Sequence, residues 1–142
     1  MKSLALVLFV ALLHVAGYTS AQQKVDLKGV TPTVKLEATD FGYLSDLKGK
    51  YKLRVTELVF EPGGSIGEHH HVGPGIRYVA SGELTRVVGG KTLTYKAGEY
   101  WYTAGDTTSS GSNKTKSPAR VINFEILPAD LKGGSAIPPK KK

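Results

Sequence analysis

The chain of 142 residues lacks cysteine altogether and holds one tryptophan and one methionine. Without cysteine it can form no disulfide, no thiolate metal site and no cysteine nucleophile. No long apolar run follows residue 15, so we expect no stable membrane insertion of the remaining chain. No long stretch after that point has apolar residues at helical spacing either. Stability must therefore come from a packed core or a bound ligand.

The first residues have the three parts of a secretory signal peptide. A lone Lys2 precedes the apolar run 4–15, and small residues follow as far as Ala21. The run is too short for a comfortable membrane span, which needs about 20 residues. We predict cleavage after Ala21 and a protein that is secreted or periplasmic.

The formal net charge is +7, from 19 Lys and Arg against 12 Asp and Glu. Part of the excess is the run of lysines at 140–142, and the rest is scattered without a basic helix or an aromatic platform. This pattern indicates solubility and a mild affinity for anionic surfaces rather than a nucleic-acid site. A small-molecule ligand is the expected partner, and a homodimer is left open.

Short apolar segments rich in β-branched and aromatic residues alternate with glycine-rich turns. Such segments are typical of strands, and they occupy residues 34–38, 52–60, 76–80, 83–88, 91–95, 99–103 and 119–127. We expect Pro62, Gly63 and Gly64 to end the strand 52–60, and 104–118 to be a loop or an irregular pair of short strands. The fold class is therefore all-β, a sandwich or barrel able to enclose one small ligand.

The same pattern predicts the domain organisation. Residues 1–21 are the signal peptide, 22–50 an N-terminal arm with a short strand, 51–128 the β-barrel, and 129–142 a disordered basic tail.

Three of the four histidines are consecutive, at His69, His70 and His71. On a strand His69 and His71 point one way and His70 the other, because side chains alternate between faces. Two imidazoles about 7 Å apart at the backbone can converge on one ion. The plainer interpretation is a polar loop with three exposed histidines.

The surroundings of the histidines resemble the first motif of the cupin family. Gly63, His69 and His71 fall at the spacing of its glycine and His-x-His pair, and Gly82 follows at the place of its closing glycine. The segment 95–106 is similar to the second cupin motif. The resemblance covers residues 53–127 and implies a cupin jelly-roll β-barrel.

The resemblance also implies a metal held by three histidines and one glutamate. In this chain Gly75 stands at the glutamate position, Thr103 at the proline position and Thr108 at the third histidine position. Two of the four ligands remain, His69 and His71. The oxygenase and isomerase chemistry of the family depends on open positions at its metal.

Three interpretations of this site stay open. In the first, His69 and His71 bind one divalent transition metal (Fe, Mn, Ni, Cu or Zn). Asp106 is then a better third ligand than Glu68, whose side chain points away from that of His69. A metal-dependent oxidoreductase or isomerase is the enzyme that the resemblance implies.

In the second interpretation the barrel binds a small polar or anionic molecule without metal. If position 75 faces inward, Arg77 does too, and its guanidinium suits a carboxylate. His69 and His71 would then donate to the same anion, with Thr108 and Tyr78 as further ligand-binding candidates. In the third, the protein is a non-catalytic interaction module. Separately, Asn113 opens a glycosylation sequon.

Overall fold

The computed structural model describes residues 24–139, and the predicted signal peptide lies outside them. The described chain is built almost entirely of strands, and its helical content is one 3₁₀ turn, η1 (Ser45–Leu47). The strands are β1 (Leu27–Ala38), β2 (Tyr51–His71), β3 (Gly75–Ser81), β4 (Glu83–Val88), β5 (Lys91–Lys96), β6 (Tyr100–Thr103), β7 (Ser109–Ser112), β8 (Ala119–Pro128) and β9 (Ala136–Ile137). No helix in residues 24–139 is long and apolar enough to cross a membrane.

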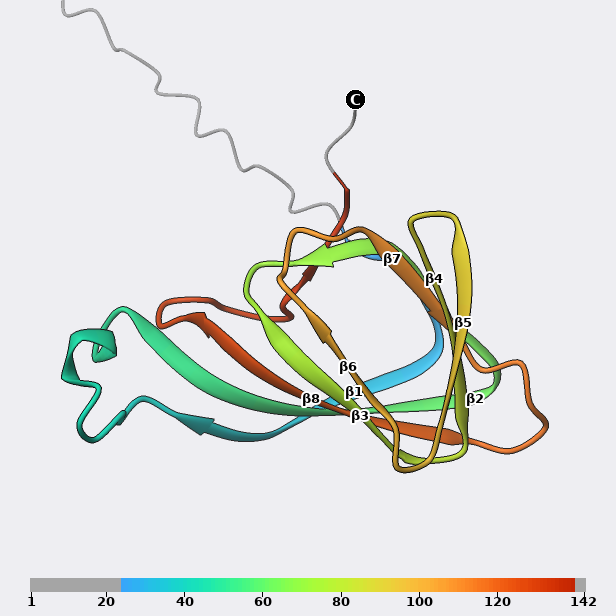
Figure 1. Cartoon of the computed structure of the whole chain (residues 1–142), viewed down its shortest axis with the longest axis horizontal. Helices are drawn as coiled ribbons and strands as arrows, with labels where there is room; N and C mark the ends of the chain where they lie inside the picture. Colours follow the sequence, from blue (N-terminus) through green and yellow to red (C-terminus); the bar gives the residue numbers. More distant parts are fainter. Residues whose placement is uncertain (1–23, 140–142) are drawn as a thin grey trace, which may run out of the picture.

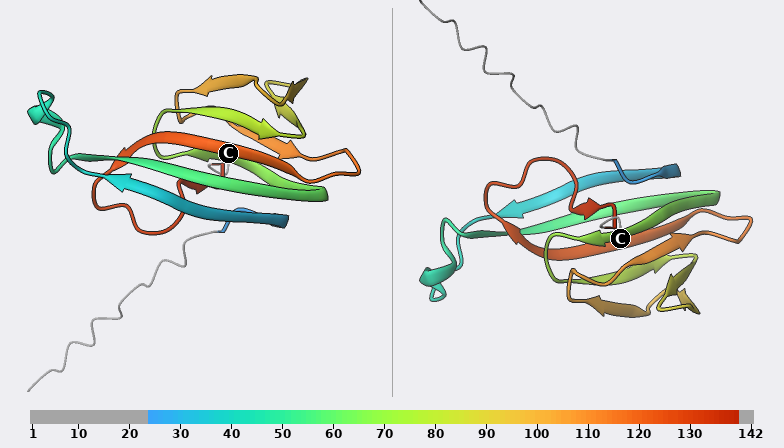
Figure 2. Two further views of the ribbon diagram at one scale, coloured as in Figure 1. Left: turned by 90° about the horizontal axis from the view of Figure 1, so that it is seen from below. Right: turned by 90° about the horizontal axis from the view of Figure 1, so that it is seen from above.

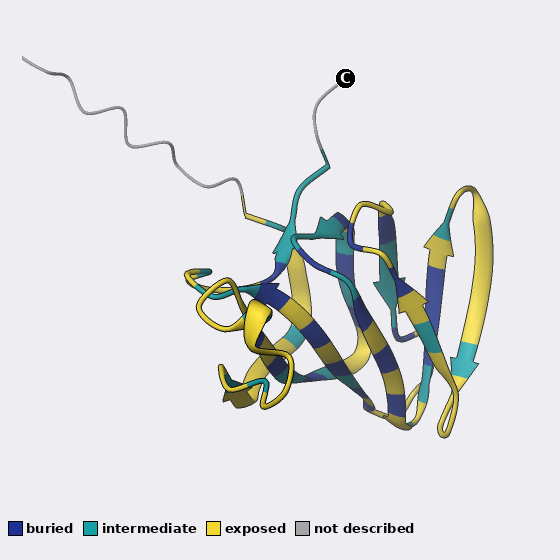
Figure 3. Ribbon diagram, turned by 60° about the vertical axis from the view of Figure 1, so that its left-hand side comes forward, coloured by how far each residue is buried: buried dark blue, intermediate teal, exposed yellow. Residues whose placement is uncertain are grey.

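All strand pairs are antiparallel, and the sheet order is β5-β4-β7-β2-β8-β3-β6, with β1 and β9 also pairing with β2. The sheet curls so that β4, β5 and β7 come to face β8 and β3 (Figures 1 and 2). Buried and exposed residues alternate along β3 and β8, as in a half-buried sheet (Figure 3). The all-β jelly-roll barrel predicted from the sequence is confirmed.

The long strand β2 belongs to both halves of the barrel. Its first half pairs with β8 as far as Phe60, and its second half pairs with β7 from Ser65 onward. The expected end at Pro62–Gly64 is wrong, because the chain bends there and continues. Gly63 supplies the bend with φ of +75°, and a Cβ on Gly64 would lie 2.5 Å from the carbonyl oxygen of Gly29. Glycine therefore lets β2 change partners without ending.

The two ends of the described chain are more ordered than the sequence indicated. β1 is 12 residues long and pairs with β2 over its length, where a short strand at 34–38 was expected. The prediction of a disordered tail from residue 129 is wrong for 129–139. Its strand β9 pairs with His70 and His71. Hydrogen bonds to distant residues hold the segment 129–139 in place. Such a segment needs no alternation of apolar and polar residues, so the sequence pattern does not reveal it.

A mainly apolar core fills part of the barrel interior. Its buried members are Leu58, Phe60, Ile66, Leu84, Ala119 and Val121, with Trp101 packed against them. Beside it, Asn113 is 1% exposed and organises the β7–β8 loop. Its Nδ2 donates to the carbonyl oxygens of Phe60, Glu61 and Ser117. The side chain of Asn113, the asparagine of the sequon, therefore has a structural role in holding this loop.

Replacing Asn113 by alanine should lower the free energy of unfolding by about 2–4 kcal/mol, because several buried carbonyl groups lose their donor at once. Urea denaturation of Asn113→Ala beside Lys114→Ala, an exposed neighbour, measures this. A loss for Asn113→Ala no larger than for Lys114→Ala would contradict the assigned role.

Candidate functional site

A cavity of about 840 Å³ occupies the interior of the barrel. One part of its wall is the apolar core, and the rest carries ionisable side chains from several strands. Its cationic lining residues are Lys24, Lys52, Arg54, Arg77, Arg86 and Lys132, and its carboxylates are Glu37 and Glu125. With neutral histidines the lining therefore has a clear excess of positive charge.

The centre of the polar wall is an ion pair between Arg77 on β3 and Glu125 on β8. Arg77 Nη2 donates to Glu125 Oε1 at 2.7 Å, and the two side chains are 3% and 1% exposed. The strand register explains why Arg77 and Glu125 come into contact. Gly75 is paired directly with Glu125 and has no side chain, so the space beside Glu125 is open to the side chain of Arg77. A Cβ on Gly75 would collide with Arg77 Nη1 and lie 2.5 Å from the carbonyl oxygen of Phe124. The inward orientation of Arg77 agrees with the parity argument from the sequence.

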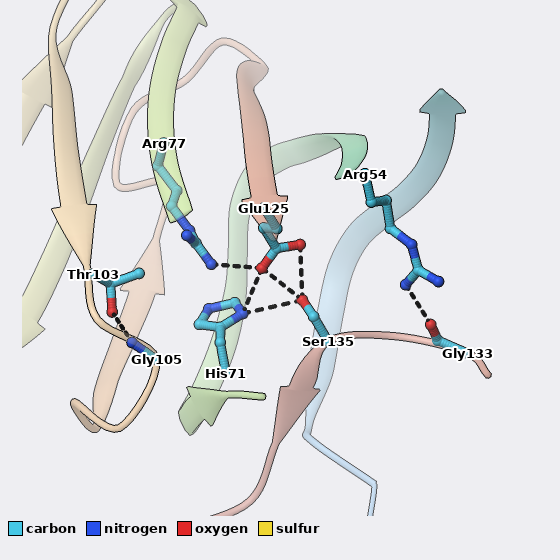
Figure 4. Close-up of polar contacts among 8 residues, drawn as sticks. All are labelled: Arg54, His71, Arg77, Thr103, Gly105, Glu125, Gly133 and Ser135. Atoms are coloured by element: carbon cyan, nitrogen blue, oxygen red, sulfur yellow. Dashed lines mark hydrogen bonds and ion pairs between the residues drawn. The ribbon is translucent and has the colours of Figure 1, made fainter. Parts of the chain in front are cut away.

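Two further groups bind the same carboxylate. His71 Nδ1 lies 3.1 Å from Glu125 Oε1, and the Ser135 hydroxyl lies 2.8 and 2.9 Å from its two oxygens (Figure 4). Burial alone would raise the pKa of Glu125, but the His71 hydrogen bond and the Arg77 charge hold it below its ordinary value. Glu125 therefore stays ionised. Sequence reasoning missed it, since it is one acidic residue on the inner face of an otherwise ordinary strand.

The two inward histidines lie against each other, with ring centroids 5.0 Å apart. Burial lowers the pKa of His69 to about 4, and it also lowers the pKa of His71. His69 Nδ1 lies 2.8 Å from the carbonyl oxygen of Gly67, which can only accept, so this nitrogen carries the proton. His71 Nδ1 likewise faces ionised Glu125. Each neutral ring thus presents Nε2 as an acceptor, which corrects the expectation that both histidines donate to an anion.

Arg86 on β4 supplies a second guanidinium to the cavity. It is 8% exposed, and its guanidinium carbon lies 5.9 Å from the centre of the Trp101 ring. Among residues 24–139 it has no carboxylate within ion-pair distance. Arg77 also keeps unused donor capacity, because its Nη1 is buried without a hydrogen-bond partner. The cavity wall therefore holds guanidinium charge that the described residues do not neutralise.

The C-terminal strap, residues 129–139, lies along one side of the cavity (Figure 4). Lys52 Nζ donates to the carbonyl oxygen of Leu131 at 2.9 Å, and Arg54 Nη1 donates to that of Gly133 at 2.6 Å. Both cations also pair with Glu37 on β1. Ser135 then brings the strap to Glu125. The strap is thus an integral part of the wall.

Three candidates from the sequence lie elsewhere. Tyr78 neighbours Arg77 along β3 and therefore points to the outer face, where it is 38% exposed. Asp106 and Thr108 are exposed and line a second groove together with His70 and His71. Neither lines the cavity, and within residues 24–139 Asp106 is not grouped with His69 and His71 to hold one ion.

A family model described as a cupin domain matches residues 56–125. The chain belongs to the cupin superfamily. No curated protein matches it. A cupin superfamily protein of Desulfitobacterium hafniense aligns at 11% identity and a TM-score of 0.53, covering 69% of this chain and 77% of that one. A cupin domain of Bordetella pertussis aligns at 21% identity and 0.52, covering 71% and 96%. These likenesses show the fold.

The metal set that the cupin resemblance implies does not fit this chain. Within residues 24–139 no three His, Asp or Glu side chains are grouped to hold one ion. The space of the family's glutamate, at Gly75, is taken by Arg77. Glu125 is already bound by Arg77, His71 and Ser135. What remains of the family's ligands is the pair of Nε2 atoms on His69 and His71.

Removing the negative charge of Glu125 should lower the stability of the fold. Glu125→Gln should lower the free energy of unfolding by about 3–5 kcal/mol, because Arg77 is left as an uncompensated buried cation. The double variant Arg77→Met/Glu125→Leu should recover much of that loss. Chemical denaturation measures both. Glu57→Gln, whose parent carboxylate pairs with Lys35 and Arg120 outside the cavity, is the control and should cost far less. Equal losses for the two glutamates would contradict the account.

The lowered pKa of His69 predicts acid sensitivity. The unfolded chain takes up a proton at about pH 6.5, the folded chain only at about 4, so stability present above pH 6.5 is lost as the pH falls toward 4. The loss is about 3 kcal/mol at most. Denaturation of the ligand-free protein across this range measures it. His69→Asn should flatten the slope, whereas His70→Asn should keep it; an unchanged slope in His69→Asn would contradict the assignment.

Proposed function

We propose that the barrel cavity binds a small organic anion, and that its preferred ligands are carboxylates that also carry a hydroxyl group. The observation that supports this is the excess of cationic side chains among the cavity lining. Buried cations are costly unless something neutralises them. An anionic ligand would do so, and the cavity volume of about 840 Å³ lies in the range of small-molecule sites.

Arg86 is the proposed anchor for the carboxylate. It lines the cavity, has no carboxylate partner among the described residues, and packs on Trp101, which holds its planar group in place. A guanidinium can bind a carboxylate through two parallel hydrogen bonds. Arg77 adds positive charge nearby but is largely committed to Glu125. Its role is to strengthen the field at the anion rather than to hold it alone.

The histidines suggest the second ligand group. With Nδ1 protonated and the ring neutral, Nε2 of His69 and of His71 can accept a hydrogen bond but cannot give one. A hydroxyl group on the ligand would donate to one of them. A hydroxycarboxylate therefore matches both parts of the wall better than a simple carboxylate does. With the predicted signal peptide, this binding would take place outside the cytoplasm.

A second candidate is a divalent transition metal on His69 and His71. It is supported by the way both Nδ1 atoms are held by Gly67 and Glu125, since metal-binding histidines commonly donate their other nitrogen to such groups. A bound metal would supply Lewis acidity to a ligand in the cavity. Against it stand the missing third and fourth ligands and the neighbouring charges of Arg77 and Arg86.

Isothermal titration with malate, lactate and citrate, beside acetate and glycerol, tests the anion proposal. Binding should be saturable for the hydroxycarboxylates, weaker for acetate and absent for glycerol. Arg86→Met should lose about 1.5–3 kcal/mol of binding free energy, which is about ten- to a hundredfold in Kd. Its stability should not fall, because no carboxylate loses its partner. Arg120→Met, which removes an arginine from outside the cavity, should bind as the wild type does.

The same samples separate the two candidates. If His69→Ala/His71→Ala abolishes a stoichiometric metal content that His70→Ala retains, and no carboxylate binds the metal-free protein, the metal is the ligand and the anion proposal fails. Hydroxycarboxylate binding by metal-free protein that Arg86→Met weakens would establish the anion site.

A further inference from the structure

Carboxylate binding at Arg86 leaves a second group of cations in the cavity without an assigned role. Lys52 and Arg54 on β2, and Lys132 on the C-terminal strap, all line the cavity. We call these three residues the strap-side cluster. Lys52 is 6% exposed and Arg54 5%, although lysine and arginine are almost never buried unless they are paired. Such burial is stable only if partners neutralise the charge.

The strap-side cluster carries more positive charge than its own partners neutralise. Glu37 is its one carboxylate partner within residues 24–139, since Lys52 Nζ and Arg54 Nε lie 3.1 and 2.6 Å from the same oxygen, Oε1. The Glu37 side chain is 40% exposed, so water screens part of its charge. Lys132 has no carboxylate within ion-pair distance among the described residues. Three cations thus share one partly exposed carboxylate.

The strap leaves room beside these cations. Arg54 Nη1 donates to the carbonyl oxygen of Gly133, and Gly133 and Gly134 both line the cavity. A Cβ on either glycine would have no heavy atom within 4 Å, so no side chain of the strap covers Arg54 at these two positions. Arg54 Nη2 makes no hydrogen bond within residues 24–139. One donor of the cluster is therefore free for a ligand.

The strap-side cluster and the guanidinium of Arg86 lie at opposite sides of one sheet. The strand order across this sheet is β1-β2-β8-β3-β6. Arg54 is held from β1 by Glu37, whereas Arg86, which comes from β4, contacts Trp101 on β6. Neighbouring strands are about 4.8 Å apart, so the three spacings from β2 to β6 amount to about 14 Å along the sheet. A ligand that uses both groups therefore needs an anion at each end.

The wall between the two cationic groups favours hydroxyl groups on the ligand. Glu125 on β8 pairs in register with Arg54 on one side and with Gly75 on the other. Figure 4 shows Glu125 between Arg54 and Arg77. Its ionised carboxylate repels an anion at this point, whereas Nε2 of His71 can accept a hydrogen bond from a hydroxyl group. A chain that carries hydroxyls between two terminal anions thus matches all three parts of the wall.

We propose that the strap-side cluster is a second anion subsite, and that the ligand is an extended polyhydroxylated acid with a second anionic group, a carboxylate or a phosphate, at its far end. This assignment rests on the proposed function, because Arg86 binds the first carboxylate. Arg54 donates its free Nη2 to the second anion, and the ammonium groups of Lys52 and Lys132 add positive charge around it. A sugar diacid has this layout.

Isothermal titration with glucarate and gluconate tests the second subsite, because the two acids differ only in one terminal group, a carboxylate against a hydroxymethyl group. The wild type should bind glucarate about ten- to a hundredfold more tightly, as expected for hydrogen bonds to a charged group. Arg54→Met should bring the ratio of the two affinities close to one, and Arg86→Met should weaken both acids and keep the ratio. Phosphogluconate should also exceed gluconate, and the tighter of the two dianions identifies the preferred terminal group.

Lys132→Met keeps the test independent of folding, since Lys132 is exposed whereas Arg54 also holds the strap. This variant should lower the ratio about two- to fivefold. Lys114→Met, at an exposed lysine outside the cavity lining, is the matched control and should keep the ratio.

A ratio near one in the wild type would overturn the second subsite, and so would a ratio that neither Arg54→Met nor Lys132→Met lowers. Gluconate binding that depends on Arg86 would in that case leave the proposed function standing. If neither acid binds, the second subsite and the proposed function both fail.

Discussion

The buried ion pair between Arg77 and Glu125 is the interaction on which the polar half of the barrel depends. Its two side chains are almost fully removed from water and 2.7 Å apart. Desolvating two charges is costly, so such a pair persists only when other groups complete the hydrogen bonding. Here His71 and Ser135 do so. The pair therefore fixes the ring orientation of His71 and attaches the C-terminal strap to the wall.

The same pair changes what a cupin barrel can hold. Arg77 takes up the space that a side chain at position 75 would need, and it brings positive charge where the family places an anionic metal ligand. With Arg86, Lys52 and Arg54 on the same cavity wall, the electrostatics favour an anion over a dication. The histidine pair is retained, but in neutral form and as acceptors.

Much of the architecture was predictable because period-2 alternation and glycine-rich turns report strands directly. The inward direction of Arg77 agrees with the parity argument, which started from the cupin-like position of Gly75. The polar side of the cavity depends on contacts that are distant in sequence. Arg77 and Glu125 are 48 residues apart and lie on different strands. Ser135, which binds Glu125, comes from a segment whose sequence has no periodic pattern. A Pro-Gly-Gly segment usually ends a strand. Here Gly63 and Gly64 only bend β2, because the strand continues past them and pairs with β7 in place of β8. Spacing also does not show the path of the β6–β7 loop, which keeps Asp106 out of the cavity lining.

The most direct measurement of the central claim is a ¹⁵N NMR titration of the arginine side chains with malate, using Arg120 as the internal reference. The guanidinium signals of Arg86 should shift saturably with malate and remain unchanged with glycerol, while those of Arg120 do not move. Saturable malate binding that leaves the Arg86 signals unchanged would contradict it, and so would the absence of any binding.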